Sequence, residues 1–337
     1  ARLTGKTADG FTIAAGESSY SARRVIIATG SKAFIPPIDG LSDVPYWTAR
    51  EALEVEELPK SIVVLGGGVI GMEFVSLFST LGVDVTVVEM LPKILGPMDE
   101  ELSTELQQTF EKRKVKFHLS TKVTAVRDGR VIAEHEGEQL EIPFDKLLVS
   151  VGRRAVTDAL GLETVGVELN RGAIVVDEHL ETSVPGIYAV GDVNGVSMLA
   201  HTAAREGQVA VHHITDYPDA MSYRAIPGIV YTDPEIASVG QTEQELRTAG
   251  VDYQVHRVPM SLSGRFVIEN EQGNGFCKLL TDSEGVILGA HMLGNGSSEI
   301  LVPAIMAVEQ RMTLTELARI VFPHPTVSEI VRVAALS

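Results

Sequence analysis

Residues 61–89 read SIVVLGGGVIGMEFVSLFSTLGVDVTVVE and restrict the fold of this chain more than any other segment. The apolar run 62–65 is typical of a parallel strand that is covered on both faces. Gly66, Gly68 and Gly71 follow at the spacing that gives a tight turn, a close approach of the backbone to a pyrophosphate, and close packing of helix on strand. The segment therefore predicts a strand, a glycine-rich turn and a helix that together bind a dinucleotide.

The residues after the glycines predict the rest of this unit. Phe74, Phe78 and Leu81 recur at i, i+4 and i+7, as on one face of a helix whose N-terminal amides face the phosphates. A second strand, 83–88, ends at Glu89, whose carboxylate would bind an adenosine ribose and repel a 2′-phosphate by about 1–4 kcal/mol. We therefore expect NAD rather than NADP. The alternative is a glycine turn that serves packing alone, and the complete order of elements argues against it.

Composition argues against several classes of partner. The chain has 337 residues, of which 28 are basic and 45 acidic, and its formal net charge is −17. This charge argues against nucleic acid and anionic membranes as partners. Because no apolar run reaches 18 residues, no membrane-spanning helix is expected. A cytoplasmic location is predicted separately, and a transit peptide ahead of this sequence would change it. The single cysteine, Cys277, excludes a disulfide within the chain, and no metal site is predicted.

The order of the predicted elements divides the chain into three domains. Residues 1–45 and 153–220, with a strand meander and the strands of VIIATGS and IYAVGDV, are assigned to one domain. Residues 46–152 alternate strand and helix as in a doubly wound parallel sheet, with an antiparallel flap between 123 and 142. Residues 221–337 place strands first and helices last, as in an α+β domain. Capping-box spacing marks three helix starts in it: Thr242 with Glu245, Thr313 with Glu316, and Thr326 with Glu329.

A second group of candidate residues follows two other apolar strands. Gly30 follows the strand of VIIATGS, and Asp192 ends the strand of IYAVGDV, at the carboxyl edge where α/β sheets place their ligands. A helix predicted from Met198 offers its N-terminal amides to an anionic group. Taken alone, Asp192 is more often a turn residue, and Gly30 could simply permit a positive φ. The residues by themselves leave both interpretations open.

His324 is the candidate catalytic residue. Pro323 and Pro325 fix the backbone on both sides of it and keep it out of a helix. Glu329 can accept a hydrogen bond from the imidazole, which would fix its tautomer and raise its basicity. The alternative is that Thr326 and Glu329 only cap the last helix, and spacing alone does not decide between the two.

Together these motifs resemble those of the pyridine nucleotide–disulfide oxidoreductases, especially the dihydrolipoamide dehydrogenase branch. IIATGS, the glycine motif, VGRR, IYAVGDV, MLAH, YTDPEIASVG and PHPTVSE occur in this order. The resemblance covers nearly the whole chain and implies FAD, NAD and a homodimer. It implies an α/β fold in which a doubly wound NAD-binding domain is inserted in a partial FAD-binding domain and is followed by an α+β dimerisation domain.

The resemblance also implies roles for single residues. His324 would be the acid–base group for a dithiol site on the other subunit, and Glu329 would orient it. The NAD would be bound by Gly66, Gly67, Gly68, Val69, Ile70, Gly71, Met72, Glu73, Glu89, Val123 and Gly152. The FAD would be bound by Thr29, Gly30, Ser31, Asp192, Met198, Leu199, Ala200 and His201. Gly71, where NADP-using relatives tend to have alanine, and Val69, where glutathione-type relatives tend to have an aromatic residue, favour the dihydrolipoamide branch.

Two features that the family needs are absent from the sequence. These are a first glycine motif for the FAD and a redox cysteine pair. Only 27 residues precede Ala28, whereas a nucleotide-binding half of that kind needs about 100. Cys277 lies on a predicted strand and is expected to be buried and inert. We therefore expect this chain to lack the front of a reductase and to be inactive alone.

The whole protein is expected to oxidise dihydrolipoamide with NAD⁺ through a disulfide and FAD. Lipoyl domains of a 2-oxo acid dehydrogenase complex are among the partners that the resemblance implies. Phe322 stands where relatives often carry a second histidine, and this departure concerns the substrate. The alternatives are a related NADH-dependent flavin reductase or transhydrogenase, and a non-catalytic, NAD-binding dimeric fragment.

Overall fold

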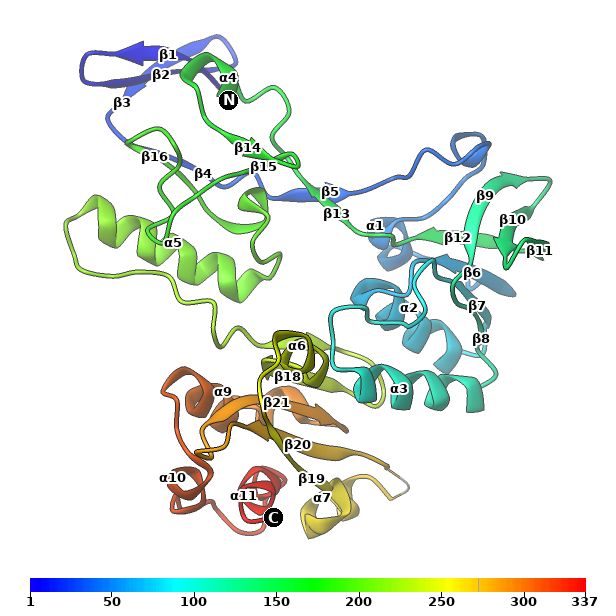
Figure 1. Cartoon of the computed structure of the whole chain (residues 1–337). Helices are drawn as coiled ribbons and strands as arrows, with labels where there is room; N and C mark the ends of the chain where they lie inside the picture. Colours follow the sequence, from blue (N-terminus) through cyan, green and yellow to red (C-terminus); the bar gives the residue numbers. More distant parts are fainter. Residues whose placement is uncertain (272) are drawn as a thin grey trace. The chain divides into compact units, whose positions relative to one another are not determined.

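The computed structural model describes residues 1–271 and 273–337, which fold into two compact units (Figure 1). One unit consists of residues 1–34 and 152–223. The other consists of residues 35–151 and 224–337. Because the chain leaves the first unit after residue 34 and returns to it at residue 152, the first unit is discontinuous, as the predicted insertion requires.

The first unit contains small sheets and one long helix. Its antiparallel meander is β1 (Arg2–Thr7), β2 (Gly10–Ala15) and β3 (Ser18–Ala22), as predicted. Three further strand pairs follow: β4 (Val25–Ile27) with β16 (Ile187–Ala189), β5 (Ser31–Ala33) with β13 (Arg153–Ala155), and β14 (Leu169–Asn170) with β15 (Ala173–Ile174). The helical elements are α4 (Leu162–Val165), the 3-10 turn η2 (Gly191–Asn194) and α5 (Ala200–Ile214). The β4–β16 and β5–β13 pairs join its two chain segments.

The second unit begins with a four-stranded parallel sheet in the order β12-β6-β7-β8. Its strands are β6 (Ser61–Leu65), β7 (Asp84–Val88), β8 (Lys116–His118) and β12 (Lys146–Val149). The helices are α1 (Ala49–Leu53), α2 (Val69–Thr80) and α3 (Glu100–Lys112), after the short turn η1 (Leu41–Asp43). The antiparallel flap is β9 (Lys122–Arg127), β10 (Arg130–His135) and β11 (Glu138–Pro143). The predicted parallel sheet and flap are both present.

Both faces of this parallel sheet are covered, which explains its unbroken apolar runs. Val64 and Val87 pack with the helices in one core. Val63, Leu65 and Val88 pack on the opposite face with apolar residues of the flap. The flap therefore occupies the second face, where a doubly wound sheet usually carries helices.

Helix α2 confirms one part of the predicted apolar face and corrects another. Phe74 and Phe78 are buried. Leu81 is 50% exposed, so its predicted inward position is wrong. The helix ends at Thr80, and Gly82 then adopts a φ of 82°, which turns the chain away from the helical face. Met72 and Val75 fill the core instead.

The C-terminal part of the second unit has an antiparallel sheet in the order β17-β18-β21-β20-β19. Its strands are β17 (Gly228–Val230), β18 (Ile236–Gly240), β19 (Gln254–Pro259), β20 (Phe276–Thr281) and β21 (Ile287–Leu293). The helical elements are α6 (Glu243–Ala249), η3 (Met260–Leu262), α7 (Gly264–Glu269), α8 (Ser297–Ile300), α9 (Val302–Glu309), α10 (Leu314–Ala318) and α11 (Glu329–Ala335). The predicted α+β order holds, with α6 and α7 between the strands.

Two of the three predicted capping boxes are complete. The Thr242 and Thr313 hydroxyls each accept a hydrogen bond from the backbone amide at the third helical position, and the glutamate at that position accepts one from the amide of the threonine. At the third site α11 begins at Glu329, so Thr326 is not its cap, although Glu329 accepts from the Thr326 amide at 3.0 Å. A further box, Thr48 with Glu51, caps α1 and has the same spacing.

The parallel sheet and the C-terminal sheet share one hydrophobic core. Val230, Ile236, Phe276 and Leu293 lie in the same buried cluster as the residues of α2 and α3. This shared core explains why residues 35–151 and 224–337 form one unit. The division into three domains remains a prediction.

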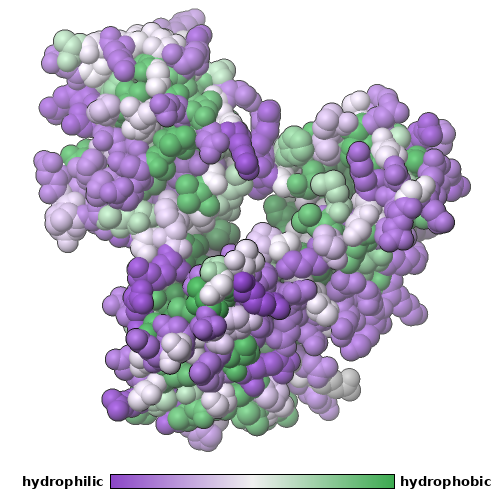
Figure 2. Space-filling model, viewed as in Figure 1, coloured by the Kyte–Doolittle hydropathy of each residue, from purple (hydrophilic) through white to green (hydrophobic). Residues whose placement is uncertain are grey.

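The surface is largely hydrophilic in the view of Figure 2. Figure 2 shows a face on which hydrophilic residues predominate and apolar residues form separate patches. Within residues 1–271 and 273–337, the structure contains no helix with the length and apolar character that crossing a membrane requires.

Candidate functional site

The three predicted glycines of the turn each have a separate physical reason. Gly66 has a φ of 104°, and a Cβ there would lie 2.6 Å from the Ser150 carbonyl oxygen. A Cβ on Gly71 would lie 2.2 Å from the Gly66 carbonyl oxygen, which shows how closely the helix packs on the turn. A Cβ on Gly68 would meet no protein atom within 4 Å. Gly68 is therefore the position where the backbone is open to a ligand.

Glu89 joins the end of β7 to this turn. One oxygen of its carboxylate accepts from the Gly67 amide at 2.5 Å, and the other accepts from the Leu91 amide at 2.7 Å. A Cβ on Gly67 would lie 3.3 Å from the Glu89 carboxylate, so glycine allows this close packing. Each carboxylate oxygen can accept more than one hydrogen bond, which leaves capacity for a ribose hydroxyl.

The other residues predicted for NAD have mixed surroundings. Met72 is fully buried, while Val69 and Ile70 are partly buried against the same core. The Glu73 carboxylate accepts from the Tyr231 amide at 2.9 Å, and burial raises the pKa of Glu73. Its side chain is thus directed at the C-terminal sheet.

Two predicted NAD residues lie away from the turn in the sequence. Val123 lies in β9 and packs partly buried against the core of the flap. Gly152 belongs to the other unit, has a φ of 125°, and accepts from the Phe34 amide at 3.0 Å. The structure therefore brings together Gly66 to Gly71 and Glu89.

Gly68→Ala is expected to weaken NADH binding by roughly tenfold, about 1.4 kcal/mol, without lowering the Tm. The reason is that its φ of −75° suits any residue and its Cβ would meet only a bound pyrophosphate. Gly71→Ala is the matched variant and is expected to lower the Tm as well, because its Cβ clashes with the turn. Calorimetric titration and thermal unfolding measure the two effects. An equal fall in Tm for both variants would contradict this assignment.

The predicted flavin residues from two distant segments meet in the first unit. The Ser31 hydroxyl donates to the Asp192 carboxylate. The Thr29 hydroxyl donates to the Val156 carbonyl at 2.7 Å, and Gly30 has a φ of 69°. The segment after β4 and the turn after β16 therefore form one polar surface.

Helix α5 begins slightly later than predicted. Its first helical residue is Ala200 and its N-cap is Leu199, so Met198 precedes the helix and is 38% exposed. His201 lies in the first turn. The helix end predicted to face an anionic group is therefore formed from Ala200 onward.

Glu206 is a buried residue that sequence reasoning missed. Its carboxylate accepts from the Gly191 amide at 2.6 Å, the Asn194 side chain at 2.9 Å and the Tyr223 hydroxyl at 2.7 Å. Because three donors surround it, the buried carboxylate has hydrogen-bond partners and η2 is fixed against α5. The burial of Glu206 could have been predicted from the sequence, since Glu206 lies on the same helical face as the apolar residues Val209 and Ala210.

His324 and Glu329 form the pair that the sequence predicted. The imidazole Nδ1 lies 3.0 and 3.1 Å from the two carboxylate oxygens, and the same carboxylate accepts from the Thr326 amide at 3.0 Å. Hydrogen bonds from Thr326 and His324 hold the pKa of Glu329 below its ordinary value. Glu329 therefore binds the imidazole and also the Thr326 amide just before α11, although Thr326 is not the cap of that helix. The His324 side chain is 81% exposed, so its Nε2 side is open to solvent.

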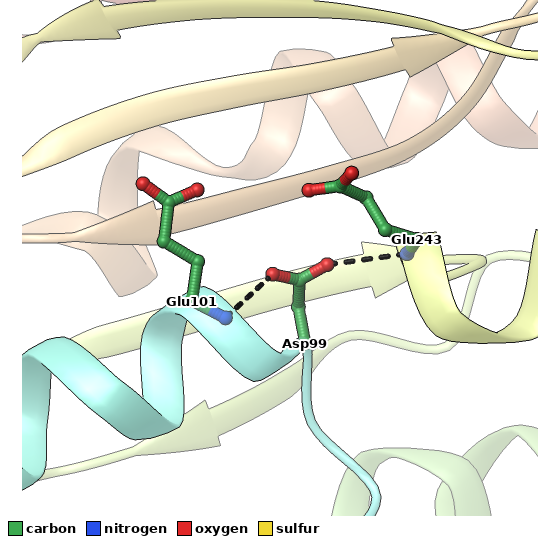
Figure 3. Close-up of side chains that lie close together, drawn as sticks. All are labelled: Asp99, Glu101 and Glu243. Atoms are coloured by element: carbon green, nitrogen blue, oxygen red, sulfur yellow. Dashed lines mark hydrogen bonds between the residues drawn. The ribbon is translucent and has the colours of Figure 1, made fainter.

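A cluster of three carboxylates lies between the N-termini of α3 and α6 (Figure 3). Asp99 accepts from the amides of Glu101 and Glu243, both at 3.2 Å. The Lys278 ammonium, fully buried, lies 2.6 Å from Asp99, 3.0 Å from Glu101 and 2.7 Å from Glu243. An ammonium has three donors, so this geometry satisfies all of them. The carboxylates lie within metal-binding distance of one another, but Lys278 already supplies their cation.

Cys277 is fully buried in β20, as expected. Burial raises the pKa of its thiol to about 12. A thiol of this kind is neither ionised at neutral pH nor accessible for disulfide exchange.

Comparison with known families agrees with these features. The family model described as pyridine nucleotide-disulphide oxidoreductase matches residues 2–207. The model described as the dimerisation domain of the same family matches residues 226–335.

Individual relatives extend this likeness. The chain is 39% identical over 329 residues to a dihydrolipoyl dehydrogenase from Rhizobium etli, covering 95% of this chain and 68% of the relative. It is 38% identical to one from Cupriavidus necator, covering 100% and 72%. Among solved structures, LpdA from Mycobacterium tuberculosis has a TM-score of 0.88 at 29% identity, covering 99% of this chain and 75% of that chain. The flavoprotein disulfide reductase RclA from Escherichia coli has a TM-score of 0.86 at 28% identity, with coverages of 97% and 76%. This chain belongs to the pyridine nucleotide-disulphide oxidoreductase family.

Proposed function

We propose that the whole protein is a dihydrolipoyl dehydrogenase, which oxidises dihydrolipoamide with NAD⁺ and acts on a sulfur group. The observation that carries the proposal is the His324–Glu329 pair, with Nδ1 at 3.0 Å from the carboxylate. Relatives 37–39% identical to this chain are named dihydrolipoyl dehydrogenase. FAD and NAD are the cofactors of this family.

NAD is assigned to the glycine turn. In this assignment the backbone at Gly68 approaches the pyrophosphate, the first turn of α2 stabilises its charge, and Glu89 accepts from the ribose. Ser31 and Asp192 would hold the flavin, with the first turn of α5 near its anionic edge. The flavin supplies two-electron transfer between a dithiol–disulfide pair and the nicotinamide.

His324 is assigned the role of acid–base group, which accepts a proton from the dithiol as it is oxidised. Oxidation of a dithiol to a disulfide releases two protons, and attack on a disulfide needs the thiolate. A neutral imidazole with Nδ1–H donated to Glu329 presents Nε2 as a base. Glu329 acts through His324 by fixing this tautomer.

The proposal concerns the whole protein because this chain has one cysteine. Cys277 is buried, and a disulfide that exchanges with substrate needs two accessible sulfurs. The chain spans 68–72% of the length of the Rhizobium and Cupriavidus relatives. Residues 1–337 alone are therefore expected to bind NADH without oxidising dihydrolipoamide.

A direct assay tests the proposal. The full-length protein, purified with its flavin, is expected to form NADH from NAD⁺ in the presence of dihydrolipoamide. Residues 1–337 are expected to respond to NADH titration, with no stable flavin absorbance near about 450 nm. Absence of dihydrolipoamide-dependent NADH formation in the full-length protein would overturn the proposal.

Phe322 favours a second candidate, a related flavin reductase or transhydrogenase that uses NADH. Its ring packs against the C-terminal core, and it carries no proton-transfer group. A panel of disulfide and quinone acceptors with NADH separates this candidate, because a dihydrolipoyl dehydrogenase would prefer lipoamide. A non-catalytic, NAD-binding dimer is the remaining alternative for residues 1–337.

A homodimer is supported by the dimerisation-domain match to residues 226–335. Lipoyl domains of a 2-oxo acid dehydrogenase complex are the partners that we propose, since dihydrolipoamide is carried on such domains. A cytoplasmic location is also part of the proposal, and cell fractionation tests it, because relatives from Dictyostelium discoideum and Arabidopsis thaliana are named mitochondrial.

A further inference from the structure

We propose that Arg153 is a positioning residue that orients Ser31 and Asp192 for the flavin. The inference rests on the flavin role assigned to Asp192 in the proposed function. Arg153 lies in β13, directly after the chain returns to the first unit, and it follows Gly152 in the VGRR motif, where only Gly152 is assigned to a cofactor. All three residues belong to that unit.

The hydrogen bonds around Ser31 lead from Arg153, which donates to Ser31, to Asp192, which accepts from Ser31. Arg153 Nε donates to the Ser31 hydroxyl oxygen at 2.7 Å, and Arg153 Nη2 donates to the Ser31 carbonyl at 2.9 Å. A guanidinium can only donate, so the Ser31 oxygen must accept, and its single proton is left for Asp192. Arg153 therefore determines where the Ser31 hydroxyl points.

This relay leaves one oxygen of Asp192 for a ligand. Ser31 donates to Oδ2, and Arg153 Nε lies 3.9 Å from the same oxygen. Both of these contacts are made by Oδ2, and neither occupies Oδ1 of Asp192. The side chain is 24% exposed, so Oδ1 can accept from a polyol hydroxyl such as those of a ribityl chain.

The turn behind Asp192 is already fixed by other groups. Glu206 accepts from the Gly191 amide at 2.6 Å and ties the turn to α5. The backbone at Asp192 is therefore fixed independently of Arg153. Arg153 acts mainly on the direction of the Asp192 carboxylate and on the electrostatic potential at it.

Arginine suits this position because its donors form a planar fork. Two of them reach two oxygens of Ser31 at once, and the positive charge lies beside the Asp192 carboxylate. Lysine would keep the charge but has a single nitrogen, so it cannot reproduce both contacts in the same geometry. Removing the charge would also leave the site more negative, which disfavours the anionic reduced flavin.

The test uses the full-length protein, stripped of flavin and titrated with FAD. Arg153→Met is expected to raise the dissociation constant for FAD about tenfold and to make the midpoint potential of the bound flavin more negative. Compared with Arg153→Met, Arg153→Lys is expected to bring the midpoint potential of the flavin closer to that of the unaltered protein than the dissociation constant for FAD. Arg154→Met is the matched control, because the Arg154 guanidinium lies 3.3 Å from Asp158, and it is expected to change neither value.

A double-mutant cycle separates this relay from general stabilisation. If Arg153 acts in part through Ser31, Arg153→Met and Ser31→Ala together should weaken FAD binding by less than the sum of the two single effects, because only the charge of Arg153 reaches Asp192 without Ser31. Additive effects, or an Arg153→Met variant within twofold of the unaltered protein, would overturn the inference. If Asp192→Asn also leaves FAD affinity unchanged, the proposed flavin role of Asp192 fails as well. The Tm of Arg153→Met is compared with the Tm of Arg154→Met. Equal Tm values exclude unfolding as the cause of weaker FAD binding in Arg153→Met.

Discussion

His324→Gln is expected to lower kcat for dihydrolipoamide oxidation by about 10²–10⁴-fold in the full-length protein. The imidazole is held through Nδ1 by Glu329 at 3.0 Å, so its Nε2 has a fixed direction for proton transfer. Glutamine keeps a similar length and polarity but cannot exchange a proton near neutral pH. Steady-state NADH formation with dihydrolipoamide as substrate measures the loss.

The control for this variant is a reaction that needs no proton from the dithiol site. Reduction of ferricyanide by NADH uses the nucleotide and flavin sites alone, and His324→Gln should leave it within about twofold, which is less than 0.5 kcal/mol. Glu329→Gln is expected to lose less activity than His324→Gln, because the imidazole remains. Equal loss of both reactions in His324→Gln would show that the histidine supports the fold or a cofactor rather than the proton.

Lys278→Met is expected to lower the free energy of unfolding by about 3–5 kcal/mol. The ammonium is fully buried and donates to Asp99, Glu101 and Glu243, so its removal leaves these carboxylates without their shared partner. Although burial alone would lower the pKa of Lys278, hydrogen bonds from its ammonium to Asp99 and Glu243 raise it. Denaturant unfolding followed by circular dichroism measures the change.

Lys116→Met is the matched control for Lys278→Met. Lys116 also forms an ion pair, with Asp84 at 3.1 Å, but both side chains are more than half exposed. Its loss should cost less than about 1 kcal/mol. Similar destabilisation by the two variants would show that the buried network contributes no more than a surface ion pair.

The same network predicts how stability depends on pH. Burial, opposed in part by Asp99, lowers the pKa of His291, which lies buried beside the cluster. An unfolded histidine takes up a proton near pH 6.5, so stability should begin to fall below that value. The pKa of Asp99 is also lowered, because His291 and Lys278 together outweigh the effect of burial. Its contribution is present above about pH 3.9 and is lost as the pH falls further.

The dinucleotide turn could be predicted because its causes are local. The apolar runs of β6 and β7, the glycine spacing and the acid after β7 each follow from neighbours in the chain. The flap and the strands of the C-terminal sheet could be predicted for the same reason. The predicted burial of Leu81 was wrong because the helical period was extended one residue past the end of α2 at Thr80.

The charged groups in the interior could not be found in this way. Lys278 is buried only because carboxylates from two other segments surround it, and Glu206 because three donors converge on it. Such burial depends on contacts between residues far apart in sequence, which hydrophobic periodicity does not describe. The common core of the parallel and C-terminal sheets was missed for the same reason. Thr48 and Glu51 were missed although the sequence shows their capping-box spacing.

Glu329 links the orientation of the catalytic histidine to the last helix of the chain. The carboxylate that anchors His324 also accepts from the Thr326 amide, just before the last helix. Helix α11 is held in place because Ile330, Val331 and Ala334 are buried in the C-terminal core. A segment with many buried apolar contacts opens only together with the core that it packs on, so the imidazole keeps its partner as long as this core is intact. On warming, dithiol oxidation should therefore be lost together with the C-terminal fold, as followed by circular dichroism, and not before it.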